Sequence, residues 1–322
     1  MLAIQVSRTG GPEVLEAVEV PTPTAGPGQI LVRHEAVGVN FIDTYLRSGL
    51  YPMKLPSILG QEAAGVVAAL GEGVDRFRIG DRVAYFAGGG GYAGFGVVPA
   101  DRAVPLPEAI AFEIAAAALL KGMTAEFLLR RCHPVQAGEA ILVQAAAGGV
   151  GTLVTQWAKR LGAVVIGTVG SEDKAVLARA HGCDHVILYR HEDVAARVRD
   201  ITGGEGVTVA YDSVGKDTLE GSLSSLARRG ILVSYGNASG PAPAIPPLRL
   251  MQGGSLFLTR PTLGDYVRKP EELADSAAQV FALITSGAVR VEIGQRFPLT
   301  EAEAAHRALE ARQTVGATVL TP

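Results

Sequence analysis

The stretch Ala145-Ala146-Ala147-Gly148-Gly149-Val150-Gly151 decides the fold of this chain. It follows a short apolar segment of strand character and opens an amphipathic segment of helical character. Gly148 and Gly149 would let the backbone approach a pyrophosphate, and Gly151 would let the helix pack closely on the strand. A glycine-rich turn in this setting predicts a dinucleotide-binding α/β unit, although Ala146 stands where the first glycine is usual.

The residues after the second expected strand, at 164–169, indicate which dinucleotide is bound. A site that prefers NAD places Asp or Glu here, against the 2′-hydroxyl of the ribose. This chain has Gly170, followed by Ser171 and Lys174, so a 2′-phosphate would meet a hydroxyl and an ammonium instead of a carboxylate. The pattern predicts NADPH. Ser171 could also cap the next helix and Lys174 could be a solvated charge, and capping is compatible with phosphate binding because both use the same helix start.

Length and composition indicate a globular protein with two domains. The chain has 322 residues, of which 48% are hydrophobic and 19% are charged, with a net charge of −3. No apolar run approaches the ~20 residues that cross a bilayer, and the first residues, Met1-Leu2-Ala3-Ile4-Gln5, lack the basic start of a signal peptide. We therefore expect a cytoplasmic protein with no membrane partner.

Charge and cysteine content argue against two other classes of protein. The slight negative charge disfavours dedicated nucleic-acid binding, which depends on clustered Lys and Arg. Cys132 and Cys183 are too few for a disulfide framework or a four-cysteine zinc lobe.

The histidines do not suggest a metal centre. His181, Cys183 and His185 alternate, but they span an expected helix end, a glycine and a strand start, so we expect their side chains to diverge. The other four histidines are interpreted as surface or cap residues; they are His34, His133, His191 and His306.

The pattern of elements changes once along the chain. Up to about residue 107 it consists of short β segments between Gly and Pro turns, which predicts a barrel-like antiparallel domain. From about residue 111, strands and helices alternate, which predicts a doubly wound sheet of six parallel strands. After Pro261 come two helical segments and a short strand that should return to the first domain, with Thr300 and Glu303 forming a capping box for the second helix. The predicted domains are therefore 1–122 with 265–322, and 123–264.

Several motifs resemble one known family. They are Asn40-Phe41-Ile42-Asp43-Thr44-Tyr45-Leu46-Arg47-Ser48-Gly49-Leu50-Tyr51, Gly60-Gln61-Glu62, the glycine turn and Tyr211-Asp212-Ser213-Val214-Gly215. Together they resemble the NADPH:quinone oxidoreductases, the zeta-crystallin-like, zinc-independent branch of the medium-chain dehydrogenase/reductase superfamily. The resemblance covers essentially the whole chain. It implies an α/β protein in which a GroES-like, β-rich catalytic domain surrounds an inserted, doubly wound Rossmann domain.

The resemblance also bears on metal binding. Zinc alcohol dehydrogenases of this superfamily carry Cys, His and Cys at positions that correspond here to Asn40, Gln61 and Lys121. None of these three is a good zinc ligand, and the ammonium of Lys121 would repel the ion. We therefore predict chemistry without a metal ion.

Site residues follow from the resemblance and from the glycine turn. Asn40, Tyr45, Tyr51, Gln61 and Lys121 are expected to orient the acceptor or to stabilise its developing oxyanion. The expected cofactor-binding residues are Asn40, Tyr45, Thr124, Gly148, Gly149, Val150, Gly170, Ser171, Lys174, Tyr189, Ser234, Asn237, Leu258 and Arg312.

Three functions remain open from the sequence. An NADPH site without an evident acid–base pair suits an acceptor that is already electrophilic, and a quinone fits because the reduced product is a stabilised anion. A reductase of α,β-unsaturated carbonyls would use the same cofactor geometry. The third function is that of a nucleotide-loaded RNA-binding or structural protein, as some zeta-crystallin-like chains are. An edge strand at 255–259, together with the resemblance, predicts a homodimer.

Overall fold

A computed structural model describes all residues, Met1–Pro322, as two compact units. Unit 1 comprises Met1–Met123, Val267–Ser286 and Val291–Pro322, and unit 2 comprises Thr124–Tyr266 and Gly287–Arg290. The chain thus leaves unit 1, forms unit 2 and returns, and each unit is described below by itself. The domain boundaries after residues 122 and 264 stay a prediction.

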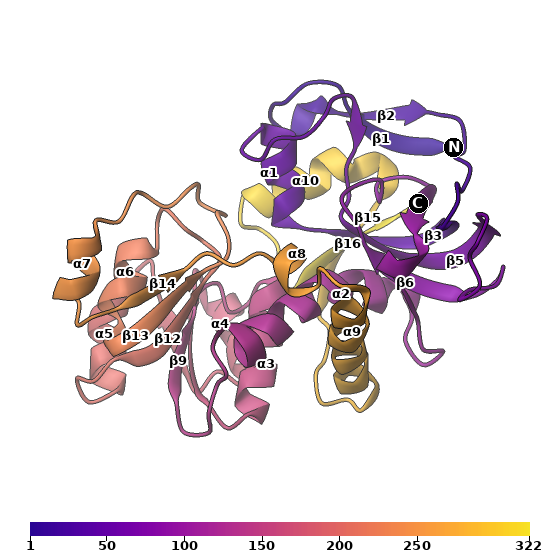
Figure 1. The fold of residues 1–322 in the computed structure, drawn as a ribbon. Helices are drawn as coiled ribbons and strands as arrows, with labels where there is room; N and C mark the ends of the chain where they lie inside the picture. The colour runs from indigo at the N-terminus through magenta and orange to yellow at the C-terminus, as the bar shows by residue number, and fades with distance from the viewer. The chain divides into compact units, whose positions relative to one another are not determined.

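Unit 2 is built on one parallel sheet, as predicted (Figure 1). Its strand order is β11-β10-β9-β12-β13-β14, and all neighbouring strands are parallel. The strands are β9 (Ala140–Val143), β10 (Val164–Val169), β11 (His185–Leu188), β12 (Val207–Asp212), β13 (Leu226–Ser234) and β14 (Phe257–Thr259). The order reverses between β9 and β12, which creates the switch point at which ligands bind in doubly wound folds.

The helices of unit 2 follow local signals in the sequence. They are α3 (Gly149–Arg160), α4 (Glu172–Ala180), α5 (Val194–Ile201), α6 (Leu219–Ser224), α7 (Pro247–Gln252) and α8 (Leu263–Tyr266). Ser171 caps α4 and Asp193 caps α5, each accepting a backbone N–H with its side chain. Apolar strand residues such as Leu142, Ile166 and Leu232 form the core against these helices.

Unit 1 is β-rich and contains the two ends of the chain (Figure 1). Its larger sheet has the order β15-β16-β3-β5-β6-β8, with β7 also paired to β3, and its smaller sheet has the order β2-β1-β4. The strands are β1 (Leu2–Val6), β2 (Leu15–Glu19), β3 (Gln29–Val39), β4 (Ser57–Ile58), β5 (Glu62–Leu70), β6 (Arg82–Phe86), β7 (Phe95–Pro99), β8 (Ala103–Pro105), β15 (Ile293–Pro298) and β16 (Ala317–Thr321). Because β16 pairs with β3, the C-terminal strand does return to the first sheet.

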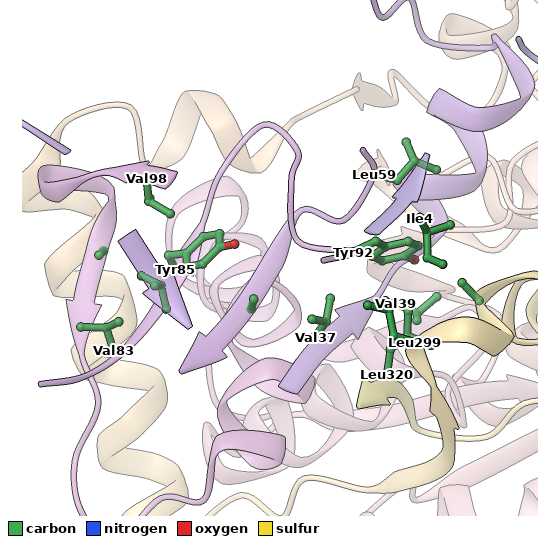
Figure 2. Packing of buried hydrophobic residues seen from close by; sticks show 14 of the residues in the cluster. Ile4, Val37, Val39, Leu59, Val83, Tyr85, Tyr92, Val98, Leu299 and Leu320 are labelled. Atoms are coloured by element: carbon green, nitrogen blue, oxygen red, sulfur yellow. The ribbon is translucent and has the colours of Figure 1, made fainter. Parts of the chain in front are cut away.

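Four helices complete unit 1 and its connections. They are α1 (Phe41–Ser48), α2 (Phe112–Phe127), α9 (Pro270–Thr285) and α10 (Ala302–Glu310). The boundary between the units falls within α2, after Met123, and α2 continues into a π-helical turn at Leu128–Cys132. Figure 2 shows the core of unit 1, where Val37 and Val39 of β3 pack with Tyr92, Leu299 and Leu320.

The predicted capping box of α10 is wrong. A 3-10 turn at Leu299–Glu301 precedes the helix, and Glu301, not Thr300, occupies the cap position without a side-chain cap hydrogen bond. Glu303 instead forms an ion pair with Arg307 one turn later on the exposed face. The turn at Leu299, which is buried, replaces the side-chain cap.

A helix must be both long and apolar to span a membrane. None of the helices meets both requirements.

Candidate active site

The first site motif forms a helix start. Asn40 lies between β3 and α1 in extended conformation, and its backbone N–H donates to Asp43 Oδ2 at 2.9 Å. A side-chain acceptor three residues into a helix compensates for backbone donors that have no partner within the helix. Asn40 is thereby fixed at the end of a central strand, with 6% of its surface exposed.

The three residues at the expected zinc positions are all buried, and we call Asn40, Gln61 and Lys121 the donor cluster. Asn40 Nδ2 donates to Glu62 Oε1 at 2.9 Å, and Lys121 Nζ donates to the same oxygen at 2.8 Å. Gln61 precedes Glu62 in the chain, and its Nε2 is buried without a hydrogen-bond partner. The cluster thus carries N–H donors that the protein does not fully use.

Glu62 is a residue of this site that the sequence reasoning missed. Its side chain is fully buried, and its Oε2 accepts the backbone N–H of Leu120 at 2.7 Å. The available signal was a carboxylate directly after Gln61 in the 60–62 motif, combined with a lysine directly after the apolar run at 114–120.

The two expected tyrosines form an aromatic pair. The rings of Tyr45 and Tyr51 are 5.3 Å apart in edge-to-face geometry, and the Tyr51 backbone N–H donates to the Tyr45 carbonyl at 3.0 Å. Tyr45 is buried, whereas Tyr51 is partly exposed. Arg312, the remaining expected residue of unit 1, lies exposed after α10 with a left-handed φ of 58°.

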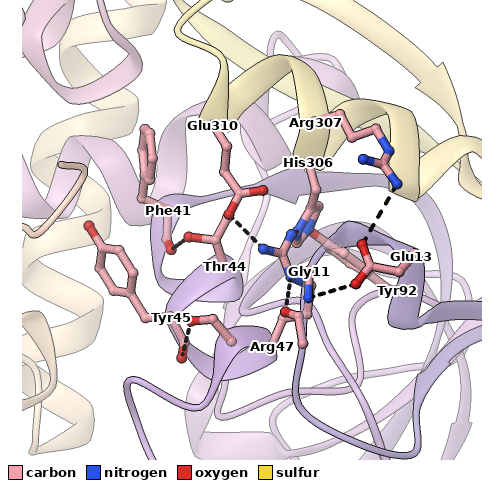
Figure 3. Close-up of polar contacts among 12 residues, drawn as sticks. Gly11, Glu13, Phe41, Thr44, Tyr45, Arg47, Tyr92, His306, Arg307 and Glu310 are labelled. Atoms are coloured by element: carbon pink, nitrogen blue, oxygen red, sulfur yellow. Dashed lines mark hydrogen bonds and ion pairs between the residues drawn. The ribbon is translucent and has the colours of Figure 1, made fainter. Parts of the chain in front are cut away.

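A buried polar network connects α1 with α10 (Figure 3). Asp43 Oδ2 accepts the hydroxyl of Tyr92 at 3.1 Å. Tyr92 Oη is 2.9 Å from His306 Nε2, and Figure 3 shows Tyr92 beside His306 and Arg47. Arg47 lies between His306 Nδ1, at 3.1 Å, and Glu310, at 2.6 Å. A guanidinium only donates hydrogen bonds, so Nδ1 accepts and Nε2 of His306 carries the proton that is donated to Tyr92.

Burial sets the protonation of this network. Desolvation lowers the pKa of His306 to about 3, with the charge of Arg47 acting in the same direction, so the imidazole is neutral. Desolvation also raises the pKa of Asp43 to about 7, although the hydrogen bonds from Asn40 and Tyr92 act in the opposite direction.

The interpretation of two histidines as surface or cap residues is wrong. His306 is fully buried, and His34 is 4% exposed between the carbonyl of Ala93 and the hydroxyl of Tyr85, each 2.7 Å from a ring nitrogen. Desolvation lowers the pKa of His34 to about 4. No local pattern in the sequence indicates this burial, because the partners of both rings lie far away along the chain.

The glycine turn of unit 2 has the expected helix-start geometry. Gly148 is the N-cap of α3 in extended conformation, and α3 begins at Gly149. A Cβ on Gly151 would lie 2.2 Å from the carbonyl oxygen of Ala145, so the helix can approach the turn this closely only with glycine there. Ala145 adopts a left-handed φ of 54°, which is unusual for a residue with a Cβ. The helix N-terminus and its free N–H groups form the kind of site that binds phosphate.

The residues expected to choose the cofactor lie at the end of β10 and the start of α4. A Cβ on Gly170 would stand 2.7 Å from Tyr189 Oη, so any side chain here would displace the tyrosine. Ser171 Oγ accepts the backbone N–H of Lys174 at 3.4 Å, which confirms the cap. The structure thus brings Gly170, Ser171, Lys174 and Tyr189 together at one helix start, without a carboxylate on the residue after the strand.

A buried chain of polar side chains supports the same edge of the sheet. Thr168 Oγ1 donates to Gln144 Oε1 at 2.6 Å, Gln144 Nε2 donates to Ser222 Oγ at 3.0 Å, and Ser222 Oγ donates to Asp212 Oδ2 at 2.7 Å. Asp212 also accepts the backbone N–H of Val214 at 2.8 Å. These residues tie together the carboxyl ends of β9, β10 and β12, and sequence reasoning did not select them as site residues.

The other expected residues of unit 2 lie at several places. Thr124, on α2, and Ser234, at the end of β13, are buried. Asn237 lies in the following loop, where its carbonyl accepts the Gly240 N–H at 2.9 Å. Leu258, on edge strand β14, is 41% exposed.

Comparisons with known proteins identify the family. Residues 26–108 match the alcohol dehydrogenase GroES-like domain, and residues 149–281 match the zinc-binding dehydrogenase domain. Over 321 residues, 99% of each chain, the sequence is 53% identical to a quinone oxidoreductase from Pseudomonas aeruginosa. The chain belongs to the quinone oxidoreductase family. It is a member of the medium-chain dehydrogenase/reductase superfamily, with the predicted GroES-like and Rossmann folds.

Two further relatives bear on its chemistry. The structure of Escherichia coli quinone oxidoreductase complexed with NADPH is 48% identical, with a TM-score of 0.98 and full coverage of both chains. A 2-haloacrylate reductase from Burkholderia sp. is 42% identical over 333 residues, covering 100% of this chain and 99% of the relative.

The metal-ligand pattern of zinc dehydrogenases is not present in this quinone oxidoreductase. No group of three or more His, Cys, Asp or Glu side chains is placed to hold a metal ion. His181 ends α4 and His185 begins β11, on either side of Gly182 with its left-handed φ of 101°. Metal-independent activity stays a prediction.

Proposed function

We propose that this quinone oxidoreductase takes reducing equivalents from NADPH and passes them to a quinone without a metal ion. The observation that supports the proposal is the donor cluster, three buried side chains with N–H groups at the positions where the resemblance to zinc dehydrogenases predicts metal ligands. NADPH, when bound, supplies the reducing equivalents. The protein's part is to bind, to orient and to stabilise charge.

Unit 2 supplies groups suited to NADPH. The start of α3 would hold the pyrophosphate through its free backbone N–H groups. Ser171, Lys174 and Tyr189 would hold the 2′-phosphate, with Lys174 forming a charge-assisted contact. The NADPH complex of the Escherichia coli relative supports this choice of cofactor.

Unit 1 supplies groups suited to a carbonyl acceptor. Reduction of a quinone places negative charge on oxygen, and pre-oriented N–H donors stabilise such charge in a dry site. Lys121 Nζ carries three protons, of which the protein accepts one at Glu62. We assign Lys121, Asn40 and Gln61 to the acceptor oxygen, and Tyr45 and Tyr51 to the apolar face of the ring.

A reductase of α,β-unsaturated carbonyl compounds is the second candidate. The 2-haloacrylate reductase relative favours it, because a haloacrylate is an activated alkene conjugated to a carboxylate. In that reaction the same donors would polarise the carboxylate oxygens of the substrate.

One comparison separates the candidates. NADPH oxidation is measured with 1,4-naphthoquinone, with 2-chloroacrylate and with no acceptor, under the same conditions. Preferential turnover of the quinone supports the proposal, and preferential turnover of the acrylate supports the second candidate. NADPH binding without turnover of either compound would contradict both and favour a binding protein.

We further propose a homodimer in the cytoplasm. Strand β14 is one of the two edge strands of the sheet in unit 2, and its Phe257 is 58% exposed. Cys132 and Cys183 are free thiols, which is typical of a reducing compartment.

A further inference from the structure

Glu62 accepts hydrogen bonds from two members of the donor cluster, Asn40 and Lys121, without belonging to it. It is the first residue of β5, its side chain is fully buried, and one oxygen, Oε1, accepts from both Asn40 Nδ2 and Lys121 Nζ. Two donors that bind the same oxygen must lie next to each other. The carboxylate therefore fixes the amide of Asn40 and the ammonium of Lys121 as neighbours.

The position of this carboxylate depends on the chain around it. Glu62 Oε2 accepts the Leu120 N–H at 2.7 Å, which ties the carboxylate to the backbone of α2 one residue before Lys121. On the neighbouring strand β3, Gly38 is the register partner of Glu62, and a Cβ there would lie 2.4 Å from Oε1. Absence of a side chain at residue 38 is thus a condition for the observed geometry.

Charge explains why the carboxylate is required. An unpaired ammonium buried as deeply as that of Lys121, with 6% of its side chain exposed, is unfavourable, and the opposite charge of Glu62 at 2.8 Å compensates for it. The pair holds the Lys121 side chain in one place, and the amine hydrogens that do not bind Glu62 can reach an acceptor oxygen.

We propose that Glu62 is the positioning residue of the active site, acting on the acceptor through Lys121 and Asn40. This inference rests on the proposed role of Lys121. Glu62 itself only accepts hydrogen bonds, so it does not contact the oxygen on which negative charge develops. The pre-orientation that it provides is the property that makes N–H donors effective in stabilising an oxyanion.

A double-mutant cycle tests this role. Glu62→Gln keeps the shape of the side chain and an oxygen that can accept from Asn40, but removes the charge that holds Lys121. Lys121→Met keeps the length of the lysine and removes its donors. The two single variants and the double variant are compared with the wild type by kcat and KM for 1,4-naphthoquinone, KM for NADPH and melting temperature.

We expect Glu62→Gln to lower kcat about 10- to 100-fold in the wild-type background, with KM for NADPH changed less than about threefold. In the Lys121→Met background, Glu62→Gln should lower kcat less than about threefold, because the lysine through which Glu62 acts is absent. An equal loss of kcat in both backgrounds, or no loss in the wild-type background, would overturn the inference. An unchanged kcat in Lys121→Met alone would instead refute the proposed role of Lys121.

Two further variants keep the test informative. Glu126→Gln is the matched control, because Glu126, on α2, is likewise a buried carboxylate in an ion pair, 2.8 Å from Arg131. This variant should lower the melting temperature and leave kcat unchanged. If Glu62→Gln does not fold, Glu62→Asp replaces it in the cycle. Aspartate keeps the negative charge, but its side chain is shorter by one methylene, so the carboxylate lies farther from Lys121. We therefore expect a smaller loss of kcat than for Glu62→Gln, again only when Lys121 is present.

Discussion

At the residue scale, the absence of a side chain at Gly170 has a direct chemical consequence. The space that a Cβ would occupy there lies 2.7 Å from Tyr189 Oη, so the tyrosine and Lys174 can approach a ribose phosphate from the same helix start. A glycine that follows a strand is common in loops, and the nearby tyrosine is the reason we propose a role in cofactor choice for this one.

Lys174→Ala should weaken NADPH binding about 10- to 150-fold, because a charge-assisted contact contributes ~1.5–3 kcal/mol. NADH binding should change little, since its ribose has no phosphate for the lysine to meet. Adding Gly170→Asp to Lys174→Ala should favour NADH further. The new aspartate side chain requires Tyr189 to move. Direct titration of both cofactors measures the effect, with Arg179→Ala on the same helix as the control; equal losses for NADH and NADPH would show that Lys174 does not contact the phosphate.

The donor cluster makes a second prediction at this scale. Because Asn40, Gln61 and Lys121 are poor zinc ligands, the purified protein should contain no stoichiometric zinc and should keep its activity in a strong chelator. Elemental analysis and assays with and without chelator provide the measurement. Tightly bound metal whose removal abolishes turnover would contradict it.

Buried His306 predicts how stability depends on pH. Its pKa is about 3 in the folded protein and about 6.5 when exposed, so the unfolded chain binds the extra proton first as the pH falls. The contribution of neutral His306 to the free energy of unfolding is complete above about pH 6.5. As the pH falls towards 3, this contribution is lost, and the free energy of unfolding decreases by an amount on the order of a few kcal/mol. His34 acts in the same direction, with a pKa of about 4. Asp43 acts oppositely, because its raised pKa of about 7 reduces stability as the pH rises from about 4 to 7.

The variant His306→Gln tests this pH dependence. Glutamine can accept from Arg47 and donate to Tyr92, but it does not titrate. The free energy of unfolding, measured in denaturant at several pH values, should fall less steeply between pH 6.5 and 4 than in the wild type. His191→Gln, at an exposed histidine, serves as the control. Identical slopes for His306→Gln and the wild type would show that His306 is not the titrating group.

At the element scale, the contact between the glycine turn and α3 sets a steric requirement. Gly151→Ala would place a Cβ 2.2 Å from the backbone oxygen of Ala145, and neither backbone segment can yield cheaply. We expect a loss of ~1–3 kcal/mol in the free energy of unfolding, together with weaker NADPH binding.

Another helical glycine provides the matched control. Gly221, on α6, has no atom within 4 Å of its added Cβ, so Gly221→Ala should be neutral or stabilise by about 0.5–1 kcal/mol through helix propensity. Chemical denaturation compares the two variants. A Gly151→Ala protein as stable as Gly221→Ala would contradict the close helix–turn contact.

Elements were predicted best where their signal is local. Strand β10 begins and ends at the predicted residues, 164 and 169. In contrast, the short helix α1 was not predicted, and β13 is irregular. It contains Arg229 with a left-handed φ of 64°, and its pairing with β12 shifts register there, a geometry that no propensity indicates. The failed cap at Thr300 has the same origin, because burial of Leu299 favours a 3-10 turn.

At the scale of the whole molecule, the edge strand β14 of the sheet in unit 2 predicts assembly. The edge strand β14 presents unpaired backbone groups and an exposed Phe257, features that a second copy of the chain can cover. Light scattering at micromolar concentration should give twice the 33.4 kDa of one chain. Phe257→Glu should shift the mass towards the monomer, because it places a charge on the edge. Ile79→Glu, at a residue of unit 1 that is 69% exposed, should leave the mass unchanged. A monomeric wild type would disprove the dimer.

The sequence by itself determined the doubly wound sheet, the glycine turn, the cap at Ser171 and the return of the C-terminal strand. Each depends on neighbours within a few residues or on a repeating apolar pattern, so it can be detected in one dimension. Only the tertiary structure decided the surroundings of the site. Glu62 contacts Lys121, which is 59 residues later in the chain, and Arg47 contacts His306, which is 259 residues later. Such contacts depend on strand order and register, which bring distant segments together, and burial at those meeting points then determines which side chains are charged.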